Sequence, residues 1–194
     1  MTRTALSLAI SASILALGAC SSGDTATEAN TAQTGEAEKA AGDKTIAASL
    51  DQNSRFFQAA KVAGLDSTLA GPGPYTVLAP GDAAFEKLPA ETADNLTKPD
   101  SRAQLTGLLT YHILPGTVLA TDIGKAIDNG KGKAVLATMG GGTLTATKEG
   151  DKIVLTDGKG GKAIVTKADD QFSNGVVHHI DTVLTPSEEA PTAG

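Results

Sequence analysis

The chain has 194 residues, 40% of them hydrophobic, which suits one folded domain with extensions. Its 16 basic and 22 acidic residues give a net charge of -6, and the basic residues form no block that could follow a phosphate backbone, so a nucleic-acid partner is not expected. With four Phe, two Tyr and no Trp, a ligand cleft lined by aromatic rings is not expected either.

The N-terminus has the features of an export signal. Arg3 precedes the apolar stretch ALSLAISASILALGA, which is too short to span a bilayer and is typical of a secretory signal peptide. The stretch ends in LGAC, which resembles the lipobox of bacterial lipoproteins, where the cysteine is acylated and becomes the new N-terminus. We therefore expect a signal peptide at 1–19 and lipid attachment at Cys20. The alternative is ordinary cleavage that leaves Cys20, the only cysteine, as a free thiol.

The residue after the cysteine and the composition that follows predict where the protein is held. Ser21 in place of Asp resembles the pattern of lipoproteins sent to the outer membrane. Residues 21–44 contain no Val, Ile, Leu or aromatic residue, so nothing there could offset the entropy of ordering the chain. We expect a disordered tether at 20–44, a folded domain at 45–186 and a disordered tail at 187–194.

Helical signals dominate the first half of the folded part. Asn53 or Ser54 can cap a helix over RFFQAAKVAGL, which Gly64 ends. The stretch YTVLA reads as a short strand, and Gly81 or Asp82 can cap a short helix that Pro89 closes. Asp100 or Ser101 opens a second clear helix, whose apolar stripe is formed by Leu105, Leu108, Leu109 and His112.

Period-two alternation dominates the second half. After a short element around TDIGKAI, strands are predicted at AVLATM, TLTATK, KIVLT, KAIVTK and GVVHHIDTVL. The second and third of these form a hairpin, in which Leu144 and Ala146 share a face with Ile153 and Leu155. Helices first and strands later predict an α+β domain.

The histidines decide between an enzyme and a binding module. In the last strand His178 and His179 point to opposite faces, so they cannot share a metal ion. His112 and His178 both lie among large apolar residues, where ring nitrogens usually bond to buried backbone groups. No metal site is expected, and His179 reads as a solvated strand residue.

Enzyme motifs and phosphate loops are equally weak. The sequence contains no GxSxG or HExxH, and no cysteine nucleophile remains once Cys20 is acylated. DGKGGK (157–162) leads into a strand and reads as a turn, while MGGGT (139–143) reads as a connection between strands. We expect no catalytic site and no cofactor; a serine triad stays a distant alternative, since it would need a hydroxyl beside an accessible histidine.

Three stretches resemble the fasciclin domain, in order and at the right separations. GPGPYTVLAPGDAAFEKLP resembles its first signature, LLTYHILPG its Tyr-His motif and SNGVVHHIDTVLTP its second signature. The resemblance covers about Thr45 to Pro186 and implies a wedge-shaped β-sandwich with helices packed against it, which agrees with a helix-rich first half and a strand-rich second half. Family members are secreted or surface-anchored, and most serve adhesion or binding to proteins and glycans.

The resemblance also assigns motif residues. The first signature matches at Asp82, the Tyr-His motif at Tyr111 and His112, and the second signature at Asn174, Gly175, His178 and Asp181. We expect all seven to be structural. His179 departs from a position that is usually apolar, and Asp169 and Asp170 stand where some animal members carry an integrin-binding Asp-Ile pair, which argues against that role here.

These observations predict an adhesion or interaction module on the bacterial cell envelope. It would be anchored by lipid at Cys20 and would bind an envelope or extracellular protein or a polysaccharide. The alternative is a carrier of a small apolar ligand, which an apolar cavity would favour.

Overall fold

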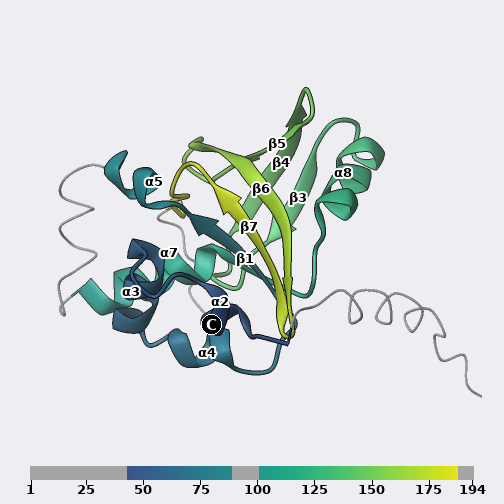
Figure 1. Ribbon diagram of the computed structural model, residues 1–194. Coiled ribbons are helices and arrows are strands. Elements are labelled where there is room, and N and C mark those ends of the chain that lie inside the picture. The colour runs from purple at the N-terminus through teal and green to yellow at the C-terminus, as the bar shows by residue number, and fades with distance from the viewer. Residues whose placement is uncertain (1–42, 89–100, 188–194) are drawn as a thin grey trace, which may run out of the picture. The chain divides into compact units, whose positions relative to one another are not determined.

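A computed structural model describes residues 43–88 and 101–187 (Figure 1). The predicted signal peptide, Cys20 and the predicted tether up to residue 42 lie outside these ranges, as do Pro89, Asp100 and the tail from residue 188. Among the helices in the described ranges, none combines the length and the apolar character that crossing a bilayer requires.

Most helices come early in the chain and most strands late, as predicted. The helices are α2 (Ile46–Ser49), α3 (Arg55–Ala63), α4 (Asp66–Ala70), α5 (Asp82–Glu86), α7 (Arg102–Tyr111) and α8 (Ala120–Asn129). The strands are β1 (Tyr75–Pro80), β2 (Ile113–Pro115), β3 (Ala134–Ala137), β4 (Thr143–Glu149), β5 (Lys152–Thr156), β6 (Lys162–Phe172) and β7 (Gly175–Ile180). The predicted α+β fold class is confirmed.

Local signals set the ends of the clearest helix. The Ser54 hydroxyl accepts a hydrogen bond from the Phe57 N–H at the start of α3, as an N-cap does. Gly64 ends α3 in the left-handed conformation, with φ +76°. In α7, by contrast, Ser101 is the N-cap but its side chain makes no capping bond, and His112 is the residue just after the last turn.

The seven strands form one sheet in the order β2-β1-β7-β6-β5-β4-β3. All neighbours are antiparallel except β1 and β7, which pair in parallel with Leu78 beside His178. The two ends of the sheet approach each other, because the Met139 N–H after β3 donates to the Ile113 carbonyl of β2 at 2.7 Å. The wedge-shaped sandwich implied by the resemblance is thus a single sheet that curls almost into a barrel.

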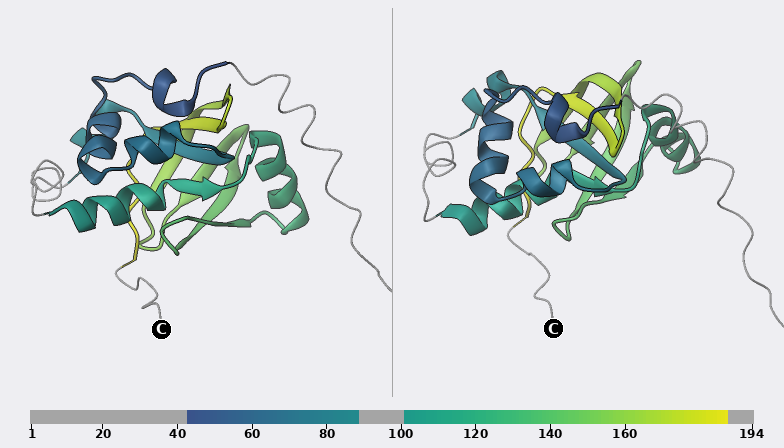
Figure 2. Two further views of the ribbon diagram at one scale, coloured as in Figure 1. Left: turned by 90° about the horizontal axis from the view of Figure 1, so that it is seen from below. Right: turned by 60° about the horizontal axis from the view of Figure 1, so that its bottom comes forward.

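Two apolar clusters lie on the two faces of β1 and β7. On one face Val77 and Val177 pack with α2, α3, α4, α5 and α7, and Figure 1 shows most of these helices gathered on that side. On the other face Leu78 and Ile180 pack with the inner face of β4, β5 and β6 and with α8. Figure 2 shows α8 standing apart from the other helices, beside the strand-rich half.

The ends of the last two strands differ from the sequence prediction. Strand β6 continues past Lys167 to Phe172, and β7 ends at Ile180 instead of running to Leu184. The pairing of β6 with β7 shifts register twice between Val165 and Asp170, which marks a bulge. This extension could not be predicted because residues 167–171 are mostly polar and show no apolar–polar alternation. They form a strand because they pair with β7. The short helices α2 and α4 were not predicted.

Candidate functional site

Asp82 ties two helices together. Gly81 is the N-cap of α5 and has no side chain to contribute, whereas the Asp82 carboxylate accepts a hydrogen bond at 2.9 Å from the Arg55 N–H. That N–H belongs to the first residue of α3, so the carboxylate also lies at the positive end of the α3 dipole. Asp82 therefore fixes α5 against α3.

Tyr111 lies in the apolar cluster on the inner face of the curled sheet. Its hydroxyl donates to the Thr143 carbonyl at 2.8 Å and accepts from the Gly158 N–H at 3.2 Å. Its ring lies so close to Gly142 that a Cβ there would come within 2.5 Å of the ring. Burial raises the pKa of Tyr111, and the nearby Asp157 carboxylate raises it further, although the Gly158 hydrogen bond works against them. The phenol is therefore neutral and joins α7 to the ends of β4 and β5.

His112 is buried and uses both ring nitrogens for backbone groups. Nε2 accepts a hydrogen bond from the Leu184 N–H at 3.0 Å, so the ring proton is on Nδ1, which donates to the Leu108 carbonyl at 2.8 Å. The ring also meets Phe56 edge-on, with centroids 6.4 Å apart. Burial lowers the pKa of His112 from 6.5 to about 4. The neutral ring thus joins α7 to the segment after β7.

Asn174 and Gly175 close the opposite end of β7. The Asn174 amide oxygen accepts from the Ile46 N–H at 2.8 Å, and its amide nitrogen donates to the carbonyls of Leu69 and Gly71, each at 2.8 Å. Gly175 has φ +150°, and a Cβ there would lie 1.9 Å from the Tyr75 carbonyl oxygen. The Asn-Gly pair therefore holds α2, α4 and the start of β1 against β7.

His178 faces the interior of the sheet and is fully buried. Its Nε2 donates to the Val118 carbonyl at 2.8 Å, and its Nδ1 accepts from the Asp169 N–H at 3.1 Å. The Asp169 carboxylate lies 3.9 Å from Nδ1, but this nitrogen already accepts an N–H and carries no proton, so the contact is not an ion pair. The carboxylate instead accepts from the Ala120 N–H at the start of α8.

His179 lies on the opposite face, as the alternation predicts, and its side chain is 39% exposed. Its Nε2 is 2.9 Å from the Asp170 carboxylate, which also pairs with Lys167 at 2.7 Å. Burial raises the pKa of Asp170, but the hydrogen bonds from Lys167 and His179 lower it by more, so the pKa is below its usual value. His178 thus bonds to the Asp169 N–H on one face of the β6 bulge, and His179 bonds to the Asp170 carboxylate on the other. These contacts were not predicted from the sequence.

Asp181 ends β7. Its carboxylate accepts from the Ile164 N–H at 2.8 Å and from the Thr182 hydroxyl at 3.0 Å, and Lys87 lies 3.4 Å from it. Burial raises the pKa of Asp181. The pKa is nevertheless below its usual value, because it is lowered by hydrogen bonds from Ile164 and Thr182 and by the charge of Lys87. Asp181 therefore links β7, β6 and the end of α5.

Sequence reasoning missed Asp157. Its buried carboxylate accepts from the N–H groups of Lys159 and Gly161, at 3.0 and 2.7 Å, and from the Thr185 N–H and hydroxyl, at 2.9 and 3.1 Å. DGKGGK is a turn, as predicted, but its aspartate also fixes the segment after β7. An Asp followed by several glycines is a sign of such side-chain-to-backbone bonding.

The described residues bring no catalytic or metal-binding set together. Within 43–88 and 101–187, no three or more His, Cys, Asp or Glu residues are placed to hold a metal ion. In the same ranges, no Ser or Thr hydroxyl is hydrogen-bonded to a histidine ring nitrogen, since the rings bond to Leu108, Leu184, Val118, Asp169 and Asp170. The seven motif residues are spread over the domain, and their contacts join different pairs of segments.

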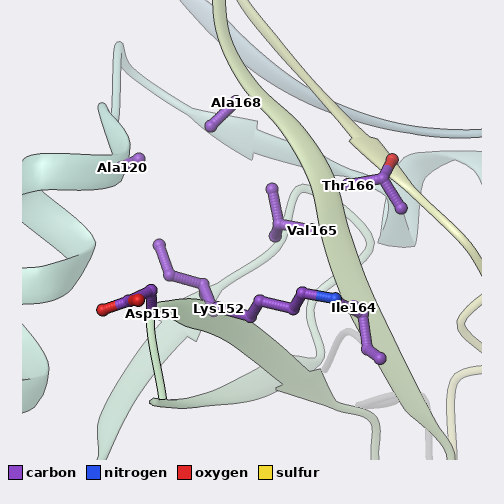
Figure 3. A pocket seen from close by; sticks show the side chains of 8 residues that line it. Ala120, Asp151, Lys152, Ile164, Val165, Thr166 and Ala168 are labelled. Carbon is purple, nitrogen blue, oxygen red and sulfur yellow. The ribbon is translucent and has the colours of Figure 1, made fainter. Parts of the chain in front are cut away.

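A pocket of about 400 Å³ lies between the start of α8, the β4–β5 turn and β6 (Figure 3). It is lined by Ala120, Asp151, Lys152, Ile153, Ile164, Val165, Thr166 and Ala168. None of the seven motif residues lines it. Its exposed members Asp151, Lys152 and Thr166 place it at the surface.

Comparison with known proteins agrees with the motifs. The family model described as Fasciclin domain matches residues 51–186. Protein sll1483 of Synechocystis sp. is 36% identical over 141 residues, which cover 73% of this chain and 71% of that protein. Transforming growth factor-beta-induced protein ig-h3 of Sus scrofa is 38% identical over 128 residues, which cover 66% of this chain and 17% of that protein.

A solved structure is also similar. The FAS1 domain pair of the insect cell adhesion molecule Fasciclin I aligns with a TM-score of 0.53 and 25% identity, over 67% of this chain and 44% of that one. The chain thus spans less than half of that domain pair and about a sixth of ig-h3. With the family model matched over most of its length, the chain belongs to the fasciclin domain family.

Proposed function

We propose that this protein is an adhesion or interaction module of the bacterial cell envelope, which binds a protein or a glycan through its fasciclin domain. The observation that carries the proposal is the similarity of this domain to the FAS1 domains of an insect cell adhesion molecule. Export, acylation of Cys20 and attachment to the outer membrane complete the proposal, and they are supported by the LGAC motif and the Ser that follows it.

The way the motif residues are used supports a binding role. His112, His178 and Asn174 direct their polar atoms at backbone groups of distant segments, so these side chains stabilise the domain and are not available to a reacting substrate. A rigid domain of this kind can present its exposed surface to a partner at little entropic cost. We propose no catalytic role and no cofactor.

The carrier alternative requires a cavity that encloses its ligand. The pocket beside α8 has a suitable volume, about 400 Å³, but three of its lining residues are exposed. Such a hollow suits a group that inserts from outside better than a ligand that must be shielded during transport. Adhesion is therefore the preferred function.

Two experiments test the proposal. Metabolic labelling with palmitate in a bacterial host should acylate the wild-type chain and leave the Cys20→Ser variant unlabelled and released from the membrane fraction. Cross-linking in intact cells, followed by isolation of the chain, should recover a reproducible envelope protein or glycan with the anchored form. Labelling of both forms would contradict the anchor, and the absence of any reproducible cross-linked species would contradict the interaction module.

A further inference from the structure

The start of α8 is held by a residue of a distant strand. Leu119 is the N-cap of α8 and makes no side-chain capping bond, so the first N–H groups of the helix lack the acceptor that a cap usually supplies. The Asp169 carboxylate of β6 supplies one instead, because its Oδ1 accepts from the Ala120 N–H at 2.8 Å. Its negative charge also lies at the positive end of the α8 dipole. Asp169 therefore takes the role of an N-cap for α8.

The same carboxylate oxygen lies near a buried histidine. Asp169 Oδ1 is 3.9 Å from His178 Nδ1, and this nitrogen accepts the Asp169 N–H at 3.1 Å. In a charged ring both nitrogens carry protons, so Nδ1 could no longer accept that N–H and would instead attract Oδ1. The oxygen therefore has two competing partners: the Ala120 N–H while His178 is neutral, and the Nδ1 proton once the ring is charged.

The backbone of Asp169 is strained in the neutral arrangement. Its φ is +61°, a conformation that non-glycine residues rarely adopt, and it lies where β6 shifts register against β7. Such conformations persist only while surrounding bonds impose them. Here these bonds are the one from the Asp169 N–H to His178 and the one from the Ala120 N–H to the carboxylate. A charged His178 removes the first, so the segment becomes freer to bring its carboxylate to the ring.

The surroundings of His178 leave Asp169 as the partner for a charged ring. Leu78 of β1 lies beside His178 in the sheet, and the Val118 carbonyl before α8 accepts from Nε2. The phenol of Tyr111, which reaches the inner face from α7, bonds to two backbone groups elsewhere. Within 43–88 and 101–187, Asp169 has the only carboxylate that lies within 4.0 Å of a His178 ring nitrogen. A positive charge on this ring would therefore be balanced by Asp169.

The other charged groups on α8 and beside the bulge have partners of their own. On the opposite face of β7, His179 bonds to the Asp170 carboxylate. Figure 2 shows α8 apart from the other helices, so the sheet must hold it in place. Beyond its first turn α8 stays attached, because Ile123 and Ile127 belong to the inner apolar cluster. The charged pairs of α8 are Asp122 with Lys125, at 3.7 Å, and Asp128 with Lys148 of β4, at 2.7 Å.

We propose that His178 and Asp169 form a pH-sensitive latch on α8: when His178 becomes charged, the Asp169 carboxylate leaves the Ala120 N–H and pairs with the ring, which frees the first turn of α8. Histidine suits this role because its charge ordinarily changes between about pH 5 and 8. The change is confined to the start of the helix, since the apolar contacts of its later turns do not involve Asp169. The latch goes beyond the proposed function, because it needs no partner.

The test is NMR of the full chain labelled with nitrogen-15, from about pH 8 to about pH 5. This range stays above the pKa of His112, about 4, so that ring remains neutral. The ring nitrogen signals of His178 report its charge. The amide protection factor of Ala120, which is corrected for the direct effect of pH on exchange, reports its bond to Asp169. As His178 becomes charged, this protection factor should fall about tenfold or more, with the same midpoint.

Two variants identify the carboxylate that moves. Asp169→Asn keeps an oxygen for the Ala120 N–H and tolerates a positive φ, but it cannot form an ion pair with the ring, so Ala120 should stay protected over the whole range. Asp170→Asn removes the neighbouring charge, whose partners His179 and Lys167 lie on the other face, so Ala120 should respond as in the wild type. If Asp169→Asn does not fold, the comparison of the two midpoints in the wild type decides.

A His178 ring that stays neutral over this range would overturn the proposal, and so would a charged ring with unchanged protection of Ala120. An equal loss of protection in Asp169→Asn would also overturn it, because the carboxylate would then not be the group that moves. The amide of Leu155, a residue that pairs with Ala146 and Ala163 inside the sheet, should stay protected throughout. Its loss together with Ala120 would mean unfolding of the whole domain and would contradict a local latch.

Discussion

Replacing His112 by Ala tests the claim that the Tyr-His motif stabilises the fold. The change leaves the Leu184 N–H without its acceptor and the Leu108 carbonyl without a donor, both in the interior. Each buried group left unpaired costs about 1 to 3 kcal/mol, so we expect destabilisation by about 3 kcal/mol or more. At roughly 2 to 4 °C per kcal/mol for a domain near this size, the melting temperature should fall by about 6 to 12 °C.

The effect of His112 on stability should depend on pH. Burial lowers its pKa from 6.5 to about 4, so the unfolded chain takes up a proton at a higher pH than the folded one. The stability that comes with the neutral ring is therefore complete above pH 6.5 and falls as the pH drops toward 4, by about 3 kcal/mol in total. The His112→Ala variant lacks this dependence, so its deficit should shrink with acidification.

The assay is thermal unfolding of residues 45–194 by circular dichroism at pH 7 and pH 4.5, for the wild type and His112→Ala. The control is His179→Ala, whose partly exposed hydrogen bond to Asp170 should contribute only about 0 to 1 kcal/mol. An unchanged melting temperature at pH 7 would refute the structural role. A deficit that is the same at both pH values would refute the buried neutral ring.

The other predictions concern the end residues of β7. Asn174→Asp keeps the acceptor oxygen but loses both N–H donors, one to the buried Leu69 carbonyl and one to the partly buried Gly71 carbonyl. Urea denaturation should therefore show a loss of about 2 kcal/mol or more, and an unchanged midpoint would contradict this. Gly175→Ala should abolish the soluble folded protein, since its Cβ would meet the Tyr75 carbonyl at 1.9 Å, whereas Gly81→Ala, with no atom within 4 Å of the new Cβ, should be tolerated; equal yields of the two would count against the geometry. The fold lowers the pKa of Asp181, so its carboxylate adds to the free energy of unfolding above the unfolded-state pKa of about 3.9, and this contribution is lost as the pH falls through the folded-state pKa. In the Asp181→Asn variant, the free energy of unfolding should therefore change less with pH in that window. A slope equal to that of the wild type would contradict this assignment.

Elements with strong local signals could be predicted from the sequence. The start and end of α3 follow from Ser54 and Gly64, whose capping roles need no distant partner. The hairpin of β4 and β5 follows from alternation, and the structure pairs Ala146 with Leu155 across it. The family resemblance identified the motif residues, but neither it nor the sequence pattern could predict the hydrogen bonds that these residues make.

Features that depend on distant segments could not be predicted. The parallel pairing of β1 with β7 joins residues about a hundred positions apart, and nothing in either strand names its partner. The continuation of β6 through Asp169 and Asp170 depends on His178 and His179 across the bulge. Local polarity at these positions favours a loop, and tertiary hydrogen bonds override it.

The most direct test of the central claim, that this is an interaction module and not a carrier, is native mass spectrometry of residues 45–194 purified from the protein's own host. For an interaction module we expect the bare mass of the chain, with a partner appearing only when an envelope protein or glycan is added. A reproducible excess mass from a small bound molecule would contradict it and establish the carrier function.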